Sequence, residues 1–271
     1  MTRGPARSVA LVIVLVAALA TIVPVLSVIA ISFQGSQAGI QGITSLFSHG
    51  LQAGAYVQVL TGAYIRSVGN SLIVGTASTT LALFLTLPAA FFASRRQGRL
   101  FTNSLVFNYV IRGIPGLLFL LPIYVVLRTL GWLNTYWGMA LSYQILLVPT
   151  MMGLLMPFFR AIPTEIYEAA EIDGARLWSV FTRLALPLAK GALIAAAVLG
   201  FVTSWNEFVF ALVFTGPATI TAPVDILNFL QYETVQWAPL AAGAVVLMVP
   251  GFIVGSFAGR YLVRGFGAAY S

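Results

Sequence analysis

Side chains that could carry out catalysis are almost absent from this sequence. The only histidine, His49, lies in a loop rich in serine and glycine, so no Ser/His/Asp set can be built around it. The only lysine, Lys190, stands in Ala189-Lys190-Gly191, which excludes a Gly-x-x-x-x-Gly-Lys-Ser/Thr phosphate loop. The chain has no cysteine, which excludes disulfides and thiolate metal sites. We therefore predict no catalytic, cofactor-binding or metal-binding residue, and neither ATPase nor hydrolase activity.

Carboxylates are concentrated instead in one polar stretch between Arg160 and Lys190. Long apolar runs flank it on both sides, so it is predicted to connect two membrane spans. Pro163 and Thr164 suit the start of a helix, and the acidic residues that follow complement the positive end of its dipole. The stretch contains four of the seven acidic residues of the chain: Glu165, Glu168, Glu171 and Asp173.

The same stretch predicts a helix, a glycine turn and a second helix. Ala169 and Ala170 favour helix and have almost no side chain, so the surface of another protein can approach the backbone there. Gly174 can adopt the left-handed conformation that ends a helix. An apolar stripe with i, i+3, i+4, i+7 spacing follows, formed by Leu177, Val180, Phe181 and Leu184. The pattern alone fits either an amphipathic connector on the membrane surface or a docking element for a partner subunit.

The spacing within this stretch resembles the cytoplasmic signature of binding-protein-dependent ABC transporter permeases. That signature is Glu-Ala-Ala, three residues, Gly, nine residues, an aliphatic residue, any residue and then Leu-Pro. The sequence has Glu168-Ala169-Ala170, Gly174 and Leu184-Ala185-Leu186-Pro187 at this spacing. Only Leu184 departs from the pattern, because isoleucine is usual there.

The resemblance implies that the segment is a coupling helix held in a cleft of a separate ATP-binding subunit. Glu168 would contact a basic group of that partner, and Gly174 would set the angle of the turn. ATP and magnesium would be bound by the partner subunits, so this chain would need no cofactor. The residues to which the resemblance gives the docking role are Glu168, Ala169, Ala170, Asp173 and Gly174.

The composition is that of a membrane protein. Of the 271 residues, 59% are hydrophobic and only 8% are charged, whereas soluble domains carry about 25% charged residues. The mean hydropathy is +0.96. We predict an all-α fold with six transmembrane helices, each longer than the ~20 residues needed to cross hydrocarbon: 8–33, 68–94, 101–127, 137–159, 191–214 and 238–262. The remaining predicted parts are a cytoplasmic N-terminus at 1–7, an external loop at 34–67, a coupling loop at 160–190 within a permease core at 68–264, and a cytoplasmic tail at 265–271.

The basic residues predict the orientation in the membrane. With six spans, eleven of the fourteen basic residues lie on the side of the two termini: Arg3, Arg7, Arg95, Arg96, Arg99, Arg160, Arg176, Arg183, Lys190, Arg260 and Arg264. The other side holds Arg66 and Arg128, together with the acidic Asp225 and Glu233. Because lysine and arginine are enriched in cytoplasmic loops, both termini and the coupling loop are predicted to be cytoplasmic.

A second polar group, Trp205-Asn206-Glu207-Phe208, lies within the fifth predicted span. An ionisable residue within a span is costly, so Glu207 is a candidate functional residue. One interpretation is that Asn206 and Glu207 hold this subunit to a partner permease by hydrogen bonds. The other is that they line the solute path, with Trp205 as an aromatic wall suited to the C–H faces of sugars. Arg112, inside the third span, is either a cation of that path or a snorkelling residue.

Three short motifs narrow the resemblance to the carbohydrate branch of these permeases. They are Trp205-Asn206-Glu207-Phe208, Asn70-Ser71 and Pro122-Ile123-Tyr124. The chain looks like the six-span permease subunit of maltose-type and glycerol-phosphate-type importers, from about Arg66 to the C-terminus. The resemblance implies a bacterial or archaeal cytoplasmic membrane. It also implies two ATP-binding subunits, a second homologous permease subunit and an external solute-binding protein as partners, and no nucleic acid.

The predicted function is therefore that of a translocation subunit in an ATP-driven ABC importer for a carbohydrate, with alternating access driven by a separate ATPase. A polyamine, iron or phosphonate importer of the same fold is the alternative. An ion-coupled secondary carrier is disfavoured, because such carriers usually show inverted repeats and several ionisable groups within the membrane. A purely structural membrane subunit is disfavoured by Glu207 and Arg112.

Overall fold

The computed structural model describes residues 5–35, 50–96, 98–230 and 235–267, and every regular element within them is helical. An isolated bridge between Leu230 and Val235 is the one extended pairing among these residues. The predicted all-α class is therefore confirmed. Contacts divide the chain into two units: Met1–Arg66 with Asp225–Val249, and Ser67–Val224 with Pro250–Ser271.

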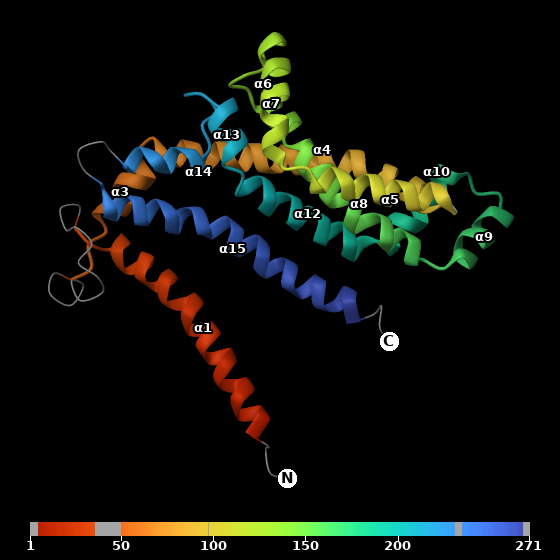
Figure 1. The fold of residues 1–271 in the computed structure, drawn as a ribbon, viewed down its shortest axis with the longest axis horizontal. Helices are drawn as coiled ribbons and strands as arrows, with labels where there is room; N and C mark the ends of the chain where they lie inside the picture. Colours follow the sequence, from red (N-terminus) through yellow and green to blue (C-terminus); the bar gives the residue numbers. More distant parts are fainter. Residues whose placement is uncertain (1–4, 36–49, 97, 231–234, 268–271) are drawn as a thin grey trace. The chain divides into compact units, whose positions relative to one another are not determined.

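The first unit joins the N-terminal helices to a later part of the chain. The Tyr64 hydroxyl donates to the Gly243 carbonyl at 3.1 Å, and the Tyr64 ring lies 5.6 Å from that of Phe229. Gln58 Nε2 donates to Gln236 Oε1 at 3.0 Å. The helical elements of this unit are α1 (Pro5–Ser32), α3 (Gly54–Thr61), the first turn of α4 (Tyr64–Ser94), η3 (Ile226–Phe229) and the first part of α15 (Trp237–Gly267) (Figure 1).

The second half of the segment 34–67, which is predicted to be an external loop, contains helical structure. α3 occupies Gly54–Thr61, and α4 already begins at Tyr64. Ala55 and Val59 lie about one turn apart and are both buried. This short helix is therefore stabilised by packing one face, which is how most helices in proteins gain stability. The predicted loop residue His49 lies outside the described residues, as do Arg3 and Glu233.

Four helices within the described ranges are long and apolar enough to cross a membrane. The qualifying segments are Val9–Ser32 in α1, Tyr64–Ser94 in α4, Gln144–Ala161 in α8 and Trp237–Phe257 in α15. Two bent helix pairs raise the number to six if each pair is one span: Phe101–Gly113 with Gly116–Thr129, and Leu177–Leu188 with Lys190–Trp205.

The third predicted span, 101–127, contains a corner of 87°. α5 (Arg99–Gly113) ends just before Pro115, and η1 (Gly116–Phe119) and α6 (Leu120–Thr129) follow. Proline has no N–H for a helical hydrogen bond, and it disfavours helical backbone at the preceding residue. The third predicted span is therefore sharply bent near Pro115.

The fifth predicted span, 191–214, is wrong as a single helix. α12 (Lys190–Trp205) ends at Trp205, and α13 (Val209–Phe214) begins after a break at 206–208. Asn206 Nδ2 donates to the Val202 carbonyl at 2.8 Å. Side chains of this kind compete for backbone groups and so weaken a helix interior. The break places the Trp-Asn-Glu-Phe group at a helix junction.

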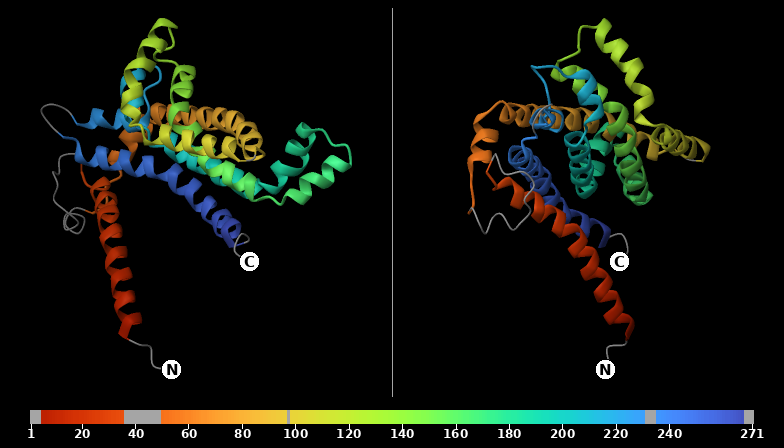
Figure 2. Two further views of the ribbon diagram at one scale, coloured as in Figure 1. Left: turned by 45° about the vertical axis from the view of Figure 1, so that its right-hand side comes forward. Right: turned by 60° about the vertical axis from the view of Figure 1, so that its left-hand side comes forward.

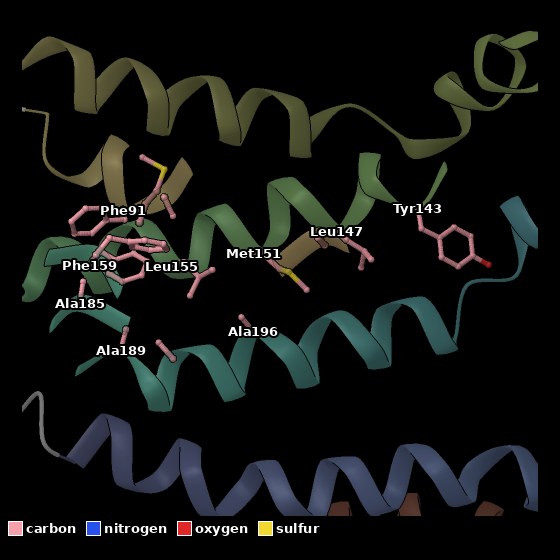
Figure 3. Close-up of a cluster of buried hydrophobic side chains, with 14 of the residues drawn as sticks. Phe91, Tyr143, Leu147, Met151, Leu155, Phe159, Ala185, Ala189 and Ala196 are labelled. Carbon is pink, nitrogen blue, oxygen red and sulfur yellow. The ribbon is translucent and has the colours of Figure 1, made fainter. Parts of the chain in front are cut away.

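The second unit packs around α8 (Gln144–Ala161), which lies against both α5 and α12 (Figures 1 and 2). Residues at every fourth position of α8 are fully buried: Leu147, Met151, Leu155 and Phe159. Small residues from the segment around α12 lie opposite this row, among them Ala185, Ala189 and Ala196 (Figure 3). A Cβ added at Gly200 would overlap Met151 Cε. Small residues allow two helix backbones to approach closely, which is how membrane helices gain packing contacts.

The Asn70-Ser71 pair near the start of α4 holds the segment that follows α13. Asn70 Nδ2 donates to the Ile220 carbonyl at 2.9 Å, and Ser71 Oγ accepts the N–H of Ala222 at 2.8 Å. The Tyr136 hydroxyl, at the start of α7 (Tyr136–Ser142), donates to Asn70 Oδ1 at 2.7 Å. The polar segment 218–222 is therefore fixed to one end of α4.

Candidate functional site

The polar stretch forms the helix, glycine turn and second helix that its sequence predicts. α9 (Thr164–Ile172) leads into Gly174, whose φ of +74° is in the left-handed region. The second part comprises α10 (Leu177–Val180), a π-helical turn η2 (Phe181–Ala185) and α11 (Leu186–Leu188). α9 and α10 lie beyond one end of α8 in both figures (Figures 1 and 2). We call residues 164–188 the coupling segment.

The predicted docking residues divide between two faces of the coupling segment. Glu168, Ala169, Asp173 and Gly174 are exposed. Ala170 is buried, and its exposed fraction is only 8%. Ala170 therefore faces the core of its own chain together with Tyr167, about one turn earlier, and not the exposed face on which Ala169 lies.

Exposed apolar side chains on the coupling segment were not singled out from the sequence. Ile172 and Trp178 are 86% and 60% exposed. Leu177, which belongs to the predicted apolar stripe, is exposed as well, whereas Val180 and Phe181 are buried. Exposed apolar patches of this kind mark sites of interaction with another protein or with the membrane.

Phe91 of α4 is the centre of an aromatic cluster beneath the coupling segment. It is fully buried. Its ring centroid lies 5.8 Å from that of Phe159 on α8 and 6.1 Å from that of Tyr167 on α9. The Phe181 ring of η2 is 5.1 Å away. Both parts of the coupling segment are thus packed against the same residue of α4, in ring arrangements that aromatic pairs favour.

Two arginines link the adjoining helix ends. Arg95 Cζ, at the end of α4, lies 4.1 Å from the centroid of the Tyr167 ring, and its Nη2 is 3.6 Å from Glu171 Oε1. Arg160 Nη1, at the end of α8, donates to the carbonyls of Ser94 and Arg96 at 2.9 and 3.2 Å. Burial raises the pKa of the Tyr167 phenol above its ordinary value, and the positive charge of Arg95 acts in the opposite direction.

A cavity of about 350 Å³ brings together two of the predicted path residues. Arg112, in the last turn of α5, and Glu207, between α12 and α13, both line it. Thr150 of α8 and Thr203 of α12 also line this cavity, and they were not singled out from the sequence. The remaining lining residues are Ile111, Ile114, Gly116, Phe119, Ile145, Leu146 and Pro149.

The other two predicted path residues do not line this cavity. Trp205 is 2% exposed and stacks on Phe201 with ring centroids 5.7 Å apart. Asn206 is exposed, and its amide is directed to the backbone of α12. The structure thus places Arg112 and Glu207 at the cavity and separates them from the aromatic residue that was expected to accompany them.

A hydrogen bond holds Glu207 in place, and a glycine leaves room for Arg112. Glu207 Oε1 accepts the N–H of Phe210 at 3.0 Å and so caps the start of α13. On the other side, α8 has Gly153, where an added Cβ would lie 3.1 Å from Arg112 Nη1 and 3.3 Å from Asn108 Oδ1. Glycine at this position therefore leaves room for the polar side chains of α5.

Comparisons with known proteins identify the family of this chain. Residues 82–267 match the family described as binding-protein-dependent transport system inner membrane component. The chain is 32% identical over 203 residues to the trehalose transport system permease protein SugB of Mycobacterium tuberculosis, covering 72% of this chain and 73% of that protein. It is 30% identical over 221 residues to the trehalose/maltose transport system permease protein MalG of Thermococcus litoralis, covering 78% and 77%.

A solved structure has the same fold. It is that of a bacterial ABC transporter involved in the import of the acidic polysaccharide alginate, and it matches with a TM-score of 0.78 at 20% identity, over 96% of this chain and 99% of the other. Fold, coupling signature and family match therefore lead to one conclusion. The chain belongs to the family of binding-protein-dependent transport system inner membrane components: it is an ABC importer permease subunit, a transport component without an ATPase site of its own.

Proposed function

We propose that this chain is the translocation subunit of an ATP-driven importer whose solute is a carbohydrate. Two relatives that share at least 30% identity with it, over more than two thirds of their length, are named for trehalose or maltose transport. This observation carries the choice of a sugar over a polyamine, iron or phosphonate. The importer would lie in a bacterial or archaeal cytoplasmic membrane, which the inner-membrane family supports.

The proposed topology has six spans and places both termini in the cytoplasm. The four long helices and the two bent pairs supply six candidate spans. The excess of arginine on the side of the coupling segment supports this orientation. Under this proposal the cytoplasmic parts are 1–7, the coupling loop at 160–190 and 265–271, while 34–67 is external.

The coupling segment is the proposed docking site for an ATP-binding subunit. Glu168, Ala169, Asp173 and Gly174 would form its contact surface together with the exposed Ile172 and Trp178, and Ala170 would support that surface from inside. The partner would bind ATP and magnesium, and this chain would bind no cofactor. The complete importer would contain two such subunits, a second homologous permease subunit and an external solute-binding protein.

The cavity between α5, α8 and α12 is the proposed part of the solute path. The guanidinium of Arg112 donates hydrogen bonds, the carboxylate of Glu207 accepts them, and the hydroxyls of Thr150 and Thr203 can do both. Such a set suits the hydroxyls of a sugar. The volume of the cavity, about 350 Å³, is within the range of about 300–1,000 Å³ for small-molecule sites. In this proposal ATP-driven closure of the partner moves the coupling segment and switches access to the cavity between the two sides.

An interface role for Glu207 is the second candidate, because polar groups also join membrane helices. The partial exposure of Glu207 in the isolated chain is compatible with a contact to the partner permease. The two roles differ in their consequences, since an interface residue supports assembly and a path residue supports uptake.

Reconstitution tests the proposed function. The complete complex in proteoliposomes, with the external binding protein and ATP, should take up radiolabelled trehalose or maltose and should not take up a polyamine, a phosphonate or chelated iron. Omitting the ATP-binding subunits should abolish uptake. Uptake by this chain alone would contradict the ATP-driven mechanism, and uptake of a polyamine without any sugar would replace the proposed solute class.

The substitution Glu207→Gln distinguishes a role of Glu207 in the solute path from a role in the interface with the partner permease. The amide keeps an oxygen that can cap α13, so the fold and assembly should be unchanged, while the negative charge is lost. Uptake should fall about 10- to 100-fold, since a hydrogen bond to a charged group contributes about 1.5–3 kcal/mol. Initial uptake rates and subunit co-purification measure the two effects. Leu212→Ala, at an exposed residue of α13 outside the cavity, should behave like the wild type. Loss of assembly in Glu207→Gln would favour the interface.

A further inference from the structure

We infer that Arg95 is a positioning residue that joins the coupling segment to α4, and that α4 carries the motion to the polar segment 218–222 at its other end. This inference rests on the proposed docking role of the coupling segment. It concerns a contact inside the chain and not the surface that meets the partner.

Arg95 contacts α9 at two points that lie one helical turn apart. Its guanidinium lies over the face of Tyr167 and also pairs with Glu171, four residues further on. Residues at i and i+4 share one face of a helix. Arg95 therefore spans that turn, so that the ring contact opposes separation of the helices and the ion pair opposes rotation of α9. The buried Tyr167 ring makes the contact well defined, because it cannot rearrange freely.

A second arginine fixes the end of α4 to α8. Arg160 donates to the carbonyls of Ser94 and Arg96, on both sides of Arg95 in the chain. Ser94 is the last residue of α4 and Arg96 lies just beyond it, where carbonyls lack partners within the helix and positive charge is favoured. Arg160 thus fixes the backbone on both sides of Arg95, while the Arg95 guanidinium contacts α9. A force applied to α9 then reaches α4 and α8 together.

Hydrogen bonds also fix the other end of α4. Asn70 and Ser71 bind the backbone of 218–222, and Tyr136 in turn donates to Asn70. α4 is a continuous helix from Tyr64 to Ser94. The 25 residues from Asn70 to Arg95 correspond to roughly 37 Å at 1.5 Å per residue, more than the thickness of the hydrocarbon core. One helix therefore connects the coupling segment to the segment 218–222.

The chain has no cysteine, so a single Ala218→Cys substitution gives a reporter on this segment. Ala218 is exposed. In the complete reconstituted importer, the rate at which a membrane-impermeant maleimide labels the introduced thiol should change when ATP and the binding protein are added. With Arg95→Ala, ATP hydrolysis should continue, while the ATP-dependent change in labelling and the solute transported per ATP should both fall at least about fivefold, the lower end of typical coupling effects.

Matched variants separate positioning from general damage. Arg96→Ala removes the same charge from a neighbouring exposed side chain and should behave like the wild type. The Tyr167 hydroxyl has no hydrogen-bond partner among the described residues. Tyr167→Phe, which keeps the ring, should therefore retain coupling, whereas Tyr167→Leu should lose it. Glu171→Gln should also lower the amount of solute transported per ATP. In the double variant, Glu171→Gln should lower this ratio by less than it does in the wild-type background, because the ion-pair partner Arg95 is already absent. This exposed change also tests the contact if Arg95→Ala does not fold.

Two results would overturn the inference. The first is an unchanged ratio of transport to ATP hydrolysis in both Arg95→Ala and Glu171→Gln. The second is loss of the ATP-binding subunit from Arg95→Ala, because Arg95 would then act in docking itself. Failure of the proposed docking role would show differently: substitutions at the exposed Ala169 would leave the ATP-binding subunit bound.

Discussion

Replacing Phe91 by alanine should destabilise the second unit by about 3–5 kcal/mol, the usual cost of removing a buried phenylalanine. The expected effect is this large because the ring contacts aromatic residues of α8, α9 and η2 at once. The lost volume cannot be refilled by one neighbour, since these rings come from three separate elements. The coupling segment should lose its packing contacts with α4, and assembly with the ATP-binding subunit should decrease.

Thermal unfolding in detergent and limited proteolysis of the coupling segment measure this effect. Phe84→Ala is the matched control, because Phe84 lies on the same helix but is 75% exposed. We expect cleavage within 164–188 to become faster only in Phe91→Ala. Equal stability of the two variants would show that the aromatic cluster does not support the segment.

Replacing Ala169 by arginine should abolish most of the binding of the ATP-binding subunit. Ala169 is exposed beside Glu168, so the larger side chain leaves the fold of this chain intact and obstructs only a closely apposed partner. The affinity should fall by about 2–4 kcal/mol, or roughly 30- to 1,000-fold, as for central residues of an interface. Binding of the purified ATP-binding subunit to the reconstituted permease measures this loss.

Ala218→Arg provides the control for this prediction. It introduces the same side chain at another exposed alanine, in the segment after α13. Binding of the ATP-binding subunit should be unchanged in this variant, and thermal stability should be close to that of the wild type in both. Wild-type affinity in Ala169→Arg would show that the partner does not contact this face of α9.

Local signals in the sequence predicted the coupling segment well. Proline and threonine at its start, the glycine at 174 and the apolar spacing after it act within a few residues, and the structure has a helix, a left-handed turn and a second helix there. The same signals could not assign the two alanines to different faces. That assignment depends on how α9 packs against α4, where Tyr167 contacts Phe91, a residue far away in the sequence.

The cavity was predictable only in part. The cost of charge within a span identified Arg112 and Glu207 separately, but their common cavity depends on the packing of α5 and α12 against α8. The break at 206–208 was missed because a long apolar run suggests one helix, whereas hydrogen bonds of the polar side chains end it. α3 was missed because eight residues give too weak a periodic signal before tertiary packing is known.

The different environments of Ala169, which is exposed, and Ala170, which is buried, have a genetic consequence. Under the proposed docking role, Ala169 is exposed toward another polypeptide, whereas Ala170 is buried within its own chain. Second-site suppressors of bulky substitutions should therefore arise in different genes: in the gene for the ATP-binding subunit when position 169 is enlarged, and in the gene for this chain when position 170 is enlarged.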